Sequence, residues 1–376
     1  MKPMTSRDRF LASMERRPVD RVPFDIGGTS LTGMRPLCRQ RLRQVLGFPE
    51  PPRGSGDERL LEWAGTDFRN VGGIVRLPSR VAGRLSDRAE IDCWGVRRER
   101  IDGEWQIVNP PLRGATAADL DAYPWPEPRI DEAWLAACRQ RAQELRREAR
   151  YAVVGEHPVF GILELGCWMC GYDDFLLRLA ADPEFVKRFF DRVLAVQLAV
   201  IETYYAALGP YLDLTTSGDD FGSQNGPLLS PAMFEELVAP FFAPRIARTK
   251  ALARCPYWHH TCGSVYRLLP QLIACGIDIL NPVQTSAAEM NPSALKQRFG
   301  DRLAFWGGMD VQQFLPRATP REVVGRAREL AAVLGAGGGY VMAPAHEMQD
   351  DIPPENIVAW VEAVKAMPGA GRQPAG

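Results

Sequence analysis

Two histidines and a cysteine lie within four positions of the segment YWHHTCGSVYR, residues 257–267, although the whole chain has only four histidines. His260 and Cys262 are two positions apart. At the end of an extended strand, this spacing places both side chains on one face. A thiolate and an imidazole on one face are ligands that suit zinc. His259 would then point to the opposite face, into the packing of the protein.

A catalytic zinc needs three protein ligands and one open position. His346 follows a later strand-like run, and we expect it to be the third ligand. Gln284, Glu347 or His259 could supply a fourth ligand or contact the substrate, and a closed set of four would indicate a structural zinc instead. The alternative is that His260 is an ordinary polar residue whose hydrogen bonds are satisfied within the protein and that Cys262 packs in the core.

Carboxylates are the second kind of residue that could do chemistry. Asp219 and Asp220 are adjacent in the glycine-flanked loop SGDDFGSQNG. We expect one of them to contact the substrate or to orient a ligand imidazole, although loop aspartates are also often solvated or cap a helix. Glu164, in GILELG, and Asp310, after GGM, are weaker candidates for the same role.

The elements that must position these residues alternate between strand-like and helix-like over residues 131–376. Such alternation predicts a parallel sheet with right-handed crossovers. With the early run RVPFDI and one further strand in the N-terminal part, the count approaches eight, which predicts a (β/α)8 TIM barrel; a doubly wound open sheet is the alternative. The later strand-like runs are YAVVG (151–155), YLDLTT (211–216), YWHHT (257–261), DILNPV (278–283), LAFWGG (303–308) and YVMAPA (340–345).

All four histidines lie at the ends of these predicted strands. In a barrel, the C-terminal ends of the strands converge on one face, where the chemistry collects. The barrel prediction therefore implies that residues distant in sequence lie together as one candidate ligand cluster.

We expect a single domain over residues 1–376. Residues 1–130 form an N-terminal elaboration, with a helix over Thr5–Arg16 and a β-hairpin near 92–109 that turns at Asp102–Gly103. The proline-rich segment 123–128 marks its end.

The composition excludes several classes of function. A net charge of −1 provides no basic field for nucleic acid or an anionic membrane. No apolar run approaches the ~20 residues of a membrane span and no signal-peptide core begins the chain, so we expect a cytoplasmic protein. The eight cysteines are irregularly spaced, which argues against a disulfide framework. The pair in CWMC, 167–170, is either apolar packing or a redox motif.

The chain resembles the uroporphyrinogen decarboxylase superfamily of (β/α)8 barrels, which includes corrinoid-dependent methyltransferases. The similarity extends over nearly the whole chain. It is carried by the segments TSRDRFLASMERRPVDRVPFDIGG, GDDFGSQNGPLLSPAMFEELVAPFF, HTCGSVYRLLPQLIACGIDILNPVQ and APAHEMQDDIPPENIVAWVEAV. The decarboxylases carry an arginine-rich segment near the N-terminus that holds the substrate's carboxylates, and this chain has none.

The methyltransferase branch resembles this chain in its His-x-Cys-Gly segment, which implies that His260 and Cys262 are zinc ligands. The third ligand is usually a cysteine in the thiol-methylating enzymes, and here it is His346. One thiolate and two imidazoles leave the Zn²⁺ site with a formal charge of +1, which makes a better Lewis acid but a poorer thiolate activator. We therefore expect zinc to polarise the oxygen, sulfur or nitrogen of a small methylated compound whose methyl group passes to a corrinoid (cobalamin).

The corrinoid would come on a partner protein or free in solution, and the region 70–112 could help to dock that partner. A homodimer is possible for barrels of this type. Two other functions remain open. One is a metal-free decarboxylase of a porphyrinogen that uses Asp219 or Asp220. The other is a non-catalytic tetrapyrrole- or corrinoid-binding accessory protein.

Overall fold

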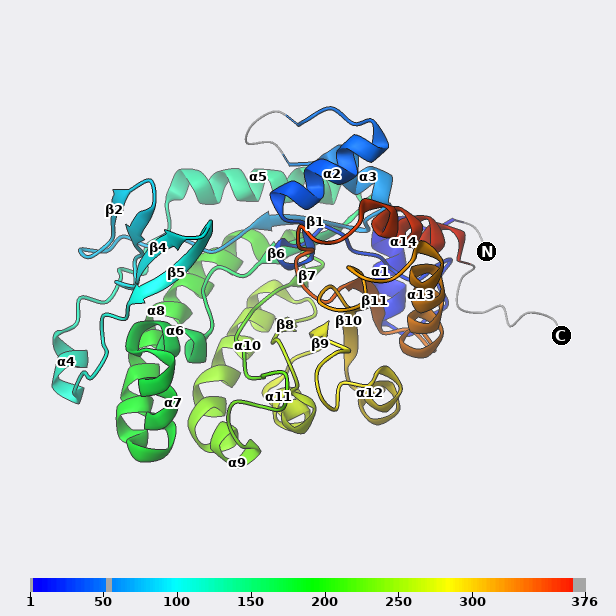
Figure 1. Ribbon diagram of the computed structural model, residues 1–376. Coiled ribbons are helices and arrows are strands. Elements are labelled where there is room, and N and C mark those ends of the chain that lie inside the picture. Colours follow the sequence, from blue (N-terminus) through cyan, green and yellow to red (C-terminus); the bar gives the residue numbers. More distant parts are fainter. Residues whose placement is uncertain (1–2, 52–55, 368–376) are drawn as a thin grey trace.

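The protein, seen in a computed structural model that describes residues 3–51 and 56–367, is built around parallel strands with helices outside them (Figure 1). One sheet has the order β1-β6-β7 and the other the order β11-β10-β9-β8. Isolated parallel bridges join Thr215 to Tyr257 and Phe24 to Met342, and Asp67 N–H donates to the Phe24 carbonyl. The strands are β1 (Phe68–Gly72), β6 (Ala152–Glu156), β7 (Leu214–Thr215), β8 (Trp258–His260), β9 (Ile279–Val283), β10 (Ala304–Met309) and β11 (Tyr340–Pro344).

These connections give the strand order of a TIM barrel, and the predicted fold class is confirmed. Each predicted strand-like run in the later part of the chain overlaps an observed strand. The run RVPFDI contributes only the bridge at Phe24. The further strand expected in the N-terminal part is β1, so residues 1–130 are not wholly outside the barrel.

Helices follow most of the strands, and many begin with proline in the first turn, where its missing N–H costs nothing. They are α1 (Ser6–Met14), α2 (Pro36–Leu46), α3 (Glu58–Ala64), α4 (Ala117–Ala122), α5 (Glu132–Glu148), α6 (Ile162–Cys170), α7 (Tyr172–Ala181), α8 (Pro183–Leu208), α9 (Pro231–Met233), α10 (Ala239–Ala253), α11 (Leu269–Cys275), α12 (Pro292–Phe299), α13 (Pro320–Leu334) and α14 (Pro354–Ala366). Short turns η1 (Ser30–Thr32), η2 (Gly209–Tyr211), η3 (Phe234–Val238) and η4 (Tyr266–Leu268) complete the set.

The helix-like segment 230–253 is interrupted. The π-helical turn η3 separates α9 from α10. Pro240, in the first turn of α10, has no N–H with which to continue the hydrogen-bond ladder of the preceding turn. The spacing of apolar residues in the sequence does not reveal such a change of helical pitch.

The predicted hairpin is confirmed as β4 (Arg97–Ile101) paired with β5 (Glu104–Asn109). Asp102 and Gly103 both have positive φ, which suits the tight turn between them. Two strands that the sequence did not indicate, β2 (Gly83–Ser86) and β3 (Ala89–Ile91), extend it to a four-stranded antiparallel sheet. They are short and solvent-accessible, so they lack the apolar alternation that marks a strand.

The barrel interior is filled by side chains from α1 and the strands. Phe10 packs edge-on against Phe68, and Trp306 contacts Phe68 and Trp258. These large buried rings occupy the middle of the barrel. Two cavities lie at the C-terminal ends of the strands.

Helix α8 corrects the expectation that no apolar stretch of the chain is long enough to span a membrane. By length and composition alone, the stretch Pro183–Tyr211 is apolar enough to cross a membrane. Half of its most apolar window is buried inside the protein, and the core helix of a folded domain passes the same test. This feature is therefore weak evidence for a membrane span.

Candidate metal centre

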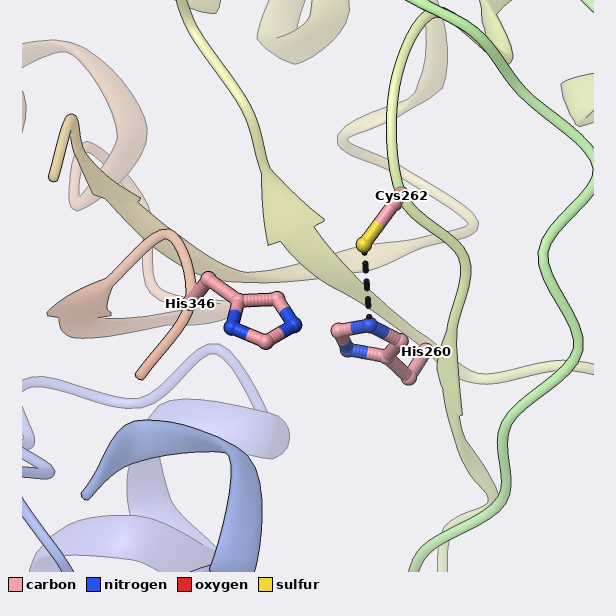
Figure 2. A group of neighbouring side chains, drawn as sticks. All are labelled: His260, Cys262 and His346. Atoms are coloured by element: carbon pink, nitrogen blue, oxygen red, sulfur yellow. Dashed lines mark hydrogen bonds between the residues drawn. The ribbon is translucent and has the colours of Figure 1, made fainter. Parts of the chain in front are cut away.

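The structure brings His260, Cys262 and His346 together at the C-terminal ends of the strands (Figure 2). His260 ends β8, and His346 follows β11. His260 Nε2 lies 3.1 Å from Cys262 Sγ, and one potential ligand atom of each residue lies within 4.8 Å of the others. Zinc bonds of ~2.0–2.3 Å place tetrahedral ligand atoms roughly 3.3–3.8 Å apart. Ligand atoms that all lie within 4.8 Å of one another could therefore reach one zinc ion after small adjustments of the side chains.

The β-sheet register fixes the orientation of His260. Asn281 is its direct partner in the β8–β9 pairing, and Asn281 Oδ1 lies 2.6 Å from His260 Nδ1. Nδ1–H therefore donates to the amide oxygen, which leaves Nε2 free to face Cys262. This is the arrangement in which a second residue fixes the tautomer of a metal-binding imidazole.

Replacing Asn281 by alanine is expected to weaken zinc binding about 10–100-fold, because the ring of His260 loses its orientation and its tautomer preference. Competition with a chromophoric chelator measures this change directly. Asn281→Asp, which keeps an oxygen acceptor, should recover most of the affinity. Equal affinity in the wild type and the alanine variant would show that Asn281 has no such role.

His346 has a different hydrogen bond. The Glu347 N–H donates to His346 Nδ1 over 2.8 Å, so that Nε2 carries the ring proton in this arrangement. Burial and the neighbouring His260 lower its pKa to about 4, so the imidazole is neutral at physiological pH. A metal bound through Nε2 requires His346 to release the Glu347 contact.

The expected fourth ligands are engaged elsewhere. Gln284 Oε1 accepts the Gly263 N–H at 2.8 Å, and Glu347 pairs with Arg35 at 3.3 Å. His259 is buried on the other face, where Nδ1 lies 2.8 Å from Ser217 Oγ, as its predicted orientation requires. Among the residues that the structure describes, the cluster thus has three members.

The two adjacent aspartates point to different places. Asp219 is buried and accepts three backbone N–H groups, from Ile162, Leu163 and Glu164, at 2.8–3.1 Å. It caps the N-terminus of α6 and is absent from the cavity lining. The expectation that Asp219 is catalytic therefore does not fit its position.

Asp220 instead faces the metal cluster. Its Oδ1 accepts the Cys262 N–H at 2.7 Å and lies 3.9 Å from His260 Nε2. Burial and the Asp220 charge raise the pKa of the Cys262 thiol, so the metal-free thiol is protonated at neutral pH. A metal would therefore have to displace that proton to bind the thiolate.

A cavity of about 400 Å³ opens beside the cluster. His260 and His346 form part of its wall, and Asp220 and Glu164 form another part. Burial and the nearby charges of Asp219 and Asp220 raise the pKa of Glu164 well above its usual value. Trp168, from α6, also lines this space.

The second cavity, of about 280 Å³, lies at the other side of the cluster. Cys262 and His346 line it together with Gln284, Gln312 and Asp310. Asp310 Oδ1 accepts the N–H groups of the two residues after Val311, which makes it a turn-stabilising residue. His346 is thus common to both cavities.

The two cysteines of CWMC are buried in α6. Burial raises the pKa of Cys170 to about 12 and raises that of Cys167 as well. Redox-active thiols have lowered pKa values, so this environment favours the packing interpretation over the redox motif.

Three polar residues of the site escaped the sequence reasoning. Glu156, at the end of β6, lines the larger cavity and accepts from Ser30 N–H at 2.7 Å. His157 Nε2 lies 2.8 Å from Nη2 of the buried Arg245. Asn281 is the third. Glu156 and His157 directly follow the predicted strand 151–155, which was the available signal, but only the barrel geometry shows which side chains face the cavity.

Residues 94–367 match the family model described as uroporphyrinogen decarboxylase (URO-D). The chain is 26% identical to uroporphyrinogen decarboxylase of Alkalilimnicola ehrlichii, over 95% of this chain and 93% of the relative. It is 25% identical to methylated-thiol–coenzyme M methyltransferase of Methanosarcina mazei, over 69% of this chain and 66% of the relative. A solved methyltransferase structure from M. mazei superposes with a TM-score of 0.60 and 17% identity, covering 96% of this chain and 98% of that one.

Proposed function

From the premise that the chain belongs to the uroporphyrinogen decarboxylase family, we propose that it is a zinc-dependent methyltransferase of that family. It would move a methyl group between a small methylated compound and a corrinoid. The observation that carries this proposal is the meeting of His260, Cys262 and His346 beside a cavity large enough for a small molecule.

The donor set fits zinc in kind and in number. One thiolate and two imidazoles are common zinc ligands, and three protein ligands leave a position for a substrate atom. When bound, the metal would supply a Lewis-acidic centre for a heteroatom of the methyl donor. Asn281 would hold the His260 ring, and the N–H···O bond to Asp220 would hold the backbone of Cys262.

The remaining residues shape the reaction space. Trp258 forms part of the cavity wall and closes it toward the packed barrel interior. Phe160 and Trp168 add apolar surface on the other side. These walls would exclude water from the site of transfer. The corrinoid would reach the open mouth from a partner protein or from solution, and we place the enzyme in the cytoplasm.

A decarboxylase of tetrapyrroles is the second candidate, because several relatives that align over most of this chain carry that name. A porphyrinogen is multiply anionic and needs cations to hold its carboxylates. The larger cavity is lined by Glu156, Glu164 and Asp220 and, among the described residues, by no lysine or arginine. This lining favours the methyltransferase proposal. An accessory protein would instead bind a tetrapyrrole or corrinoid without turnover.

The test is a methyl-transfer assay on the zinc-loaded protein. Cob(I)alamin and a panel of methylated oxygen, sulfur and nitrogen compounds are incubated with the enzyme, and formation of methylcob(III)alamin is followed by absorbance. Zinc-dependent methylation of the cobalamin supports the proposal. Absence of bound metal, together with carbon dioxide release from a porphyrinogen, would replace it with the decarboxylase.

A further inference from the structure

The larger cavity combines aromatic rings with carboxyl groups. Phe160, Trp168 and Trp258 contribute aromatic surface. Phe160 and Trp168 meet edge to face, with ring centroids 5.0 Å apart. Aromatic faces attract cations, most strongly where water is excluded.

Three carboxyl groups accompany these rings. Glu156 accepts hydrogen bonds from Ser30 N–H at 2.7 Å and Asn70 Nδ2 at 3.2 Å. Asp220 accepts the Cys262 N–H through one oxygen. Glu164 also lines the cavity and, within the described part of the chain, forms no salt bridge with a basic side chain.

The nearby arginines do not supply a basic side chain to the cavity. The Arg98 guanidinium lies 5.2 Å from the centroid of the Trp168 ring and pairs with Asp92. Arg245 is fully buried, where Nη2 contacts His157 and the Phe160 carbonyl. Neither arginine is part of the cavity lining. The cavity lining therefore offers carboxyl groups and π surface to its occupant and, among the described residues, no basic side chain.

We propose that the methylated group of the substrate is a quaternary ammonium, which binds among the aromatic rings and the carboxyl groups of Glu156 and Asp220. This inference rests on the proposed methyltransferase function and names its substrate class. In the transfer, the N–CH₃ bond breaks and its electron pair stays on nitrogen, which leaves as a neutral tertiary amine. The electron pair of cobalt(I) forms the new Co–CH₃ bond, so no external proton or oxidant is needed.

This substrate class changes the part that the His260–Cys262–His346 cluster plays. A quaternary nitrogen has no lone pair for a metal. The cluster would therefore bind a second polar group of the same donor, such as a carboxylate oxygen, and hold the molecule in place. A formal charge of +1 on the metal site suits an anionic group at that end.

The test compares three probes of nearly equal shape. Tetramethylammonium, 2,2-dimethylpropan-1-ol and trimethylacetate, which are a cation, a neutral alcohol and an anion, are titrated into the full chain by calorimetry. We expect the dissociation constant of tetramethylammonium to be at least about tenfold lower than that of the alcohol, because only the cation gains from the rings and carboxylates. Trimethylacetate should bind least tightly to the metal-free protein.

Two variants locate the effect. Glu156→Gln and Asp220→Asn keep the size of each side chain, and each should reduce the preference for the cation about threefold or more. Glu235→Gln, at an exposed position of η3, is the matched control and should leave it unchanged. Circular dichroism confirms that each variant is folded.

The outcome separates this inference from the proposed function. If the alcohol binds as tightly as tetramethylammonium to a protein that holds zinc, the substrate class is wrong and the methyltransferase proposal stands. If the preference for the cation persists in a protein that binds no zinc, the aromatic and acidic site is real and the zinc methyltransferase proposal fails.

Discussion

The Cys262→Ser variant should retain about a tenth or less of the zinc found in the wild type, where about one ion per chain is expected. Serine is a weak zinc ligand at neutral pH, and the remaining two imidazoles cannot complete a three-ligand site. Methyl transfer should fall at least about 100-fold with the loss of the metal. The measurement is metal analysis of protein purified without chelator, combined with the cobalamin assay.

Cys275→Ser is the control for this experiment. Cys275 is also a partly buried free thiol, but it ends α11 and lines neither cavity. Its zinc content and activity should match the wild type. Undiminished zinc in Cys262→Ser would mean that the ion binds elsewhere, and the assignment of the three-residue cluster would then be abandoned.

The Asp219→Ala variant is expected to lose about 3 kcal/mol or more of unfolding free energy. Three backbone N–H groups at the start of α6 lose a charged acceptor in a place that water does not reach. Hydrogen bonds to charged groups contribute roughly 1.5–3 kcal/mol each, and unsatisfied buried donors add their own cost. Urea unfolding followed by circular dichroism measures the change.

Asp220→Ala provides the contrast, since the neighbouring side chain is partly exposed and accepts one N–H. We expect its unfolding free energy to change by about 1 kcal/mol. Its effect should appear instead in zinc affinity and in methyl transfer. Equal destabilisation by the two variants would show that the division of roles between the aspartates is wrong.

The barrel could be predicted from the sequence because its signals are local. Apolar runs of strand length alternate with helices that begin at proline, and the parallel pairing of these units follows from their order. The short strands β2 and β3 carry no such signal, since β2 is exposed and β3 is only half-buried. The π-helical turn η3 likewise leaves no mark in the spacing of apolar residues.

The cluster of His260, Cys262 and His346 could be predicted from rarity and position, since all four histidines lie at the ends of strand-like runs. The roles of Asp219 and Asp220 could not. Adjacent residues in a loop have no fixed side-chain directions. The Asp219 side chain points inward because the N-terminus of α6 lies beside it and its carboxylate caps that helix. The role of Asn281 could not be predicted either, because its contact with His260 depends on the register of β8 against β9.

The order of the four-stranded sheet, β11-β10-β9-β8, has a mechanical consequence. His260 and Cys262 belong to one edge of that sheet, and His346 belongs to the other. A single ion bound by His260, Cys262 and His346 would link the two edges of this curved sheet. Removing the ion with a chelator would remove this link, so the melting temperature of the whole barrel should be lower when the site is empty.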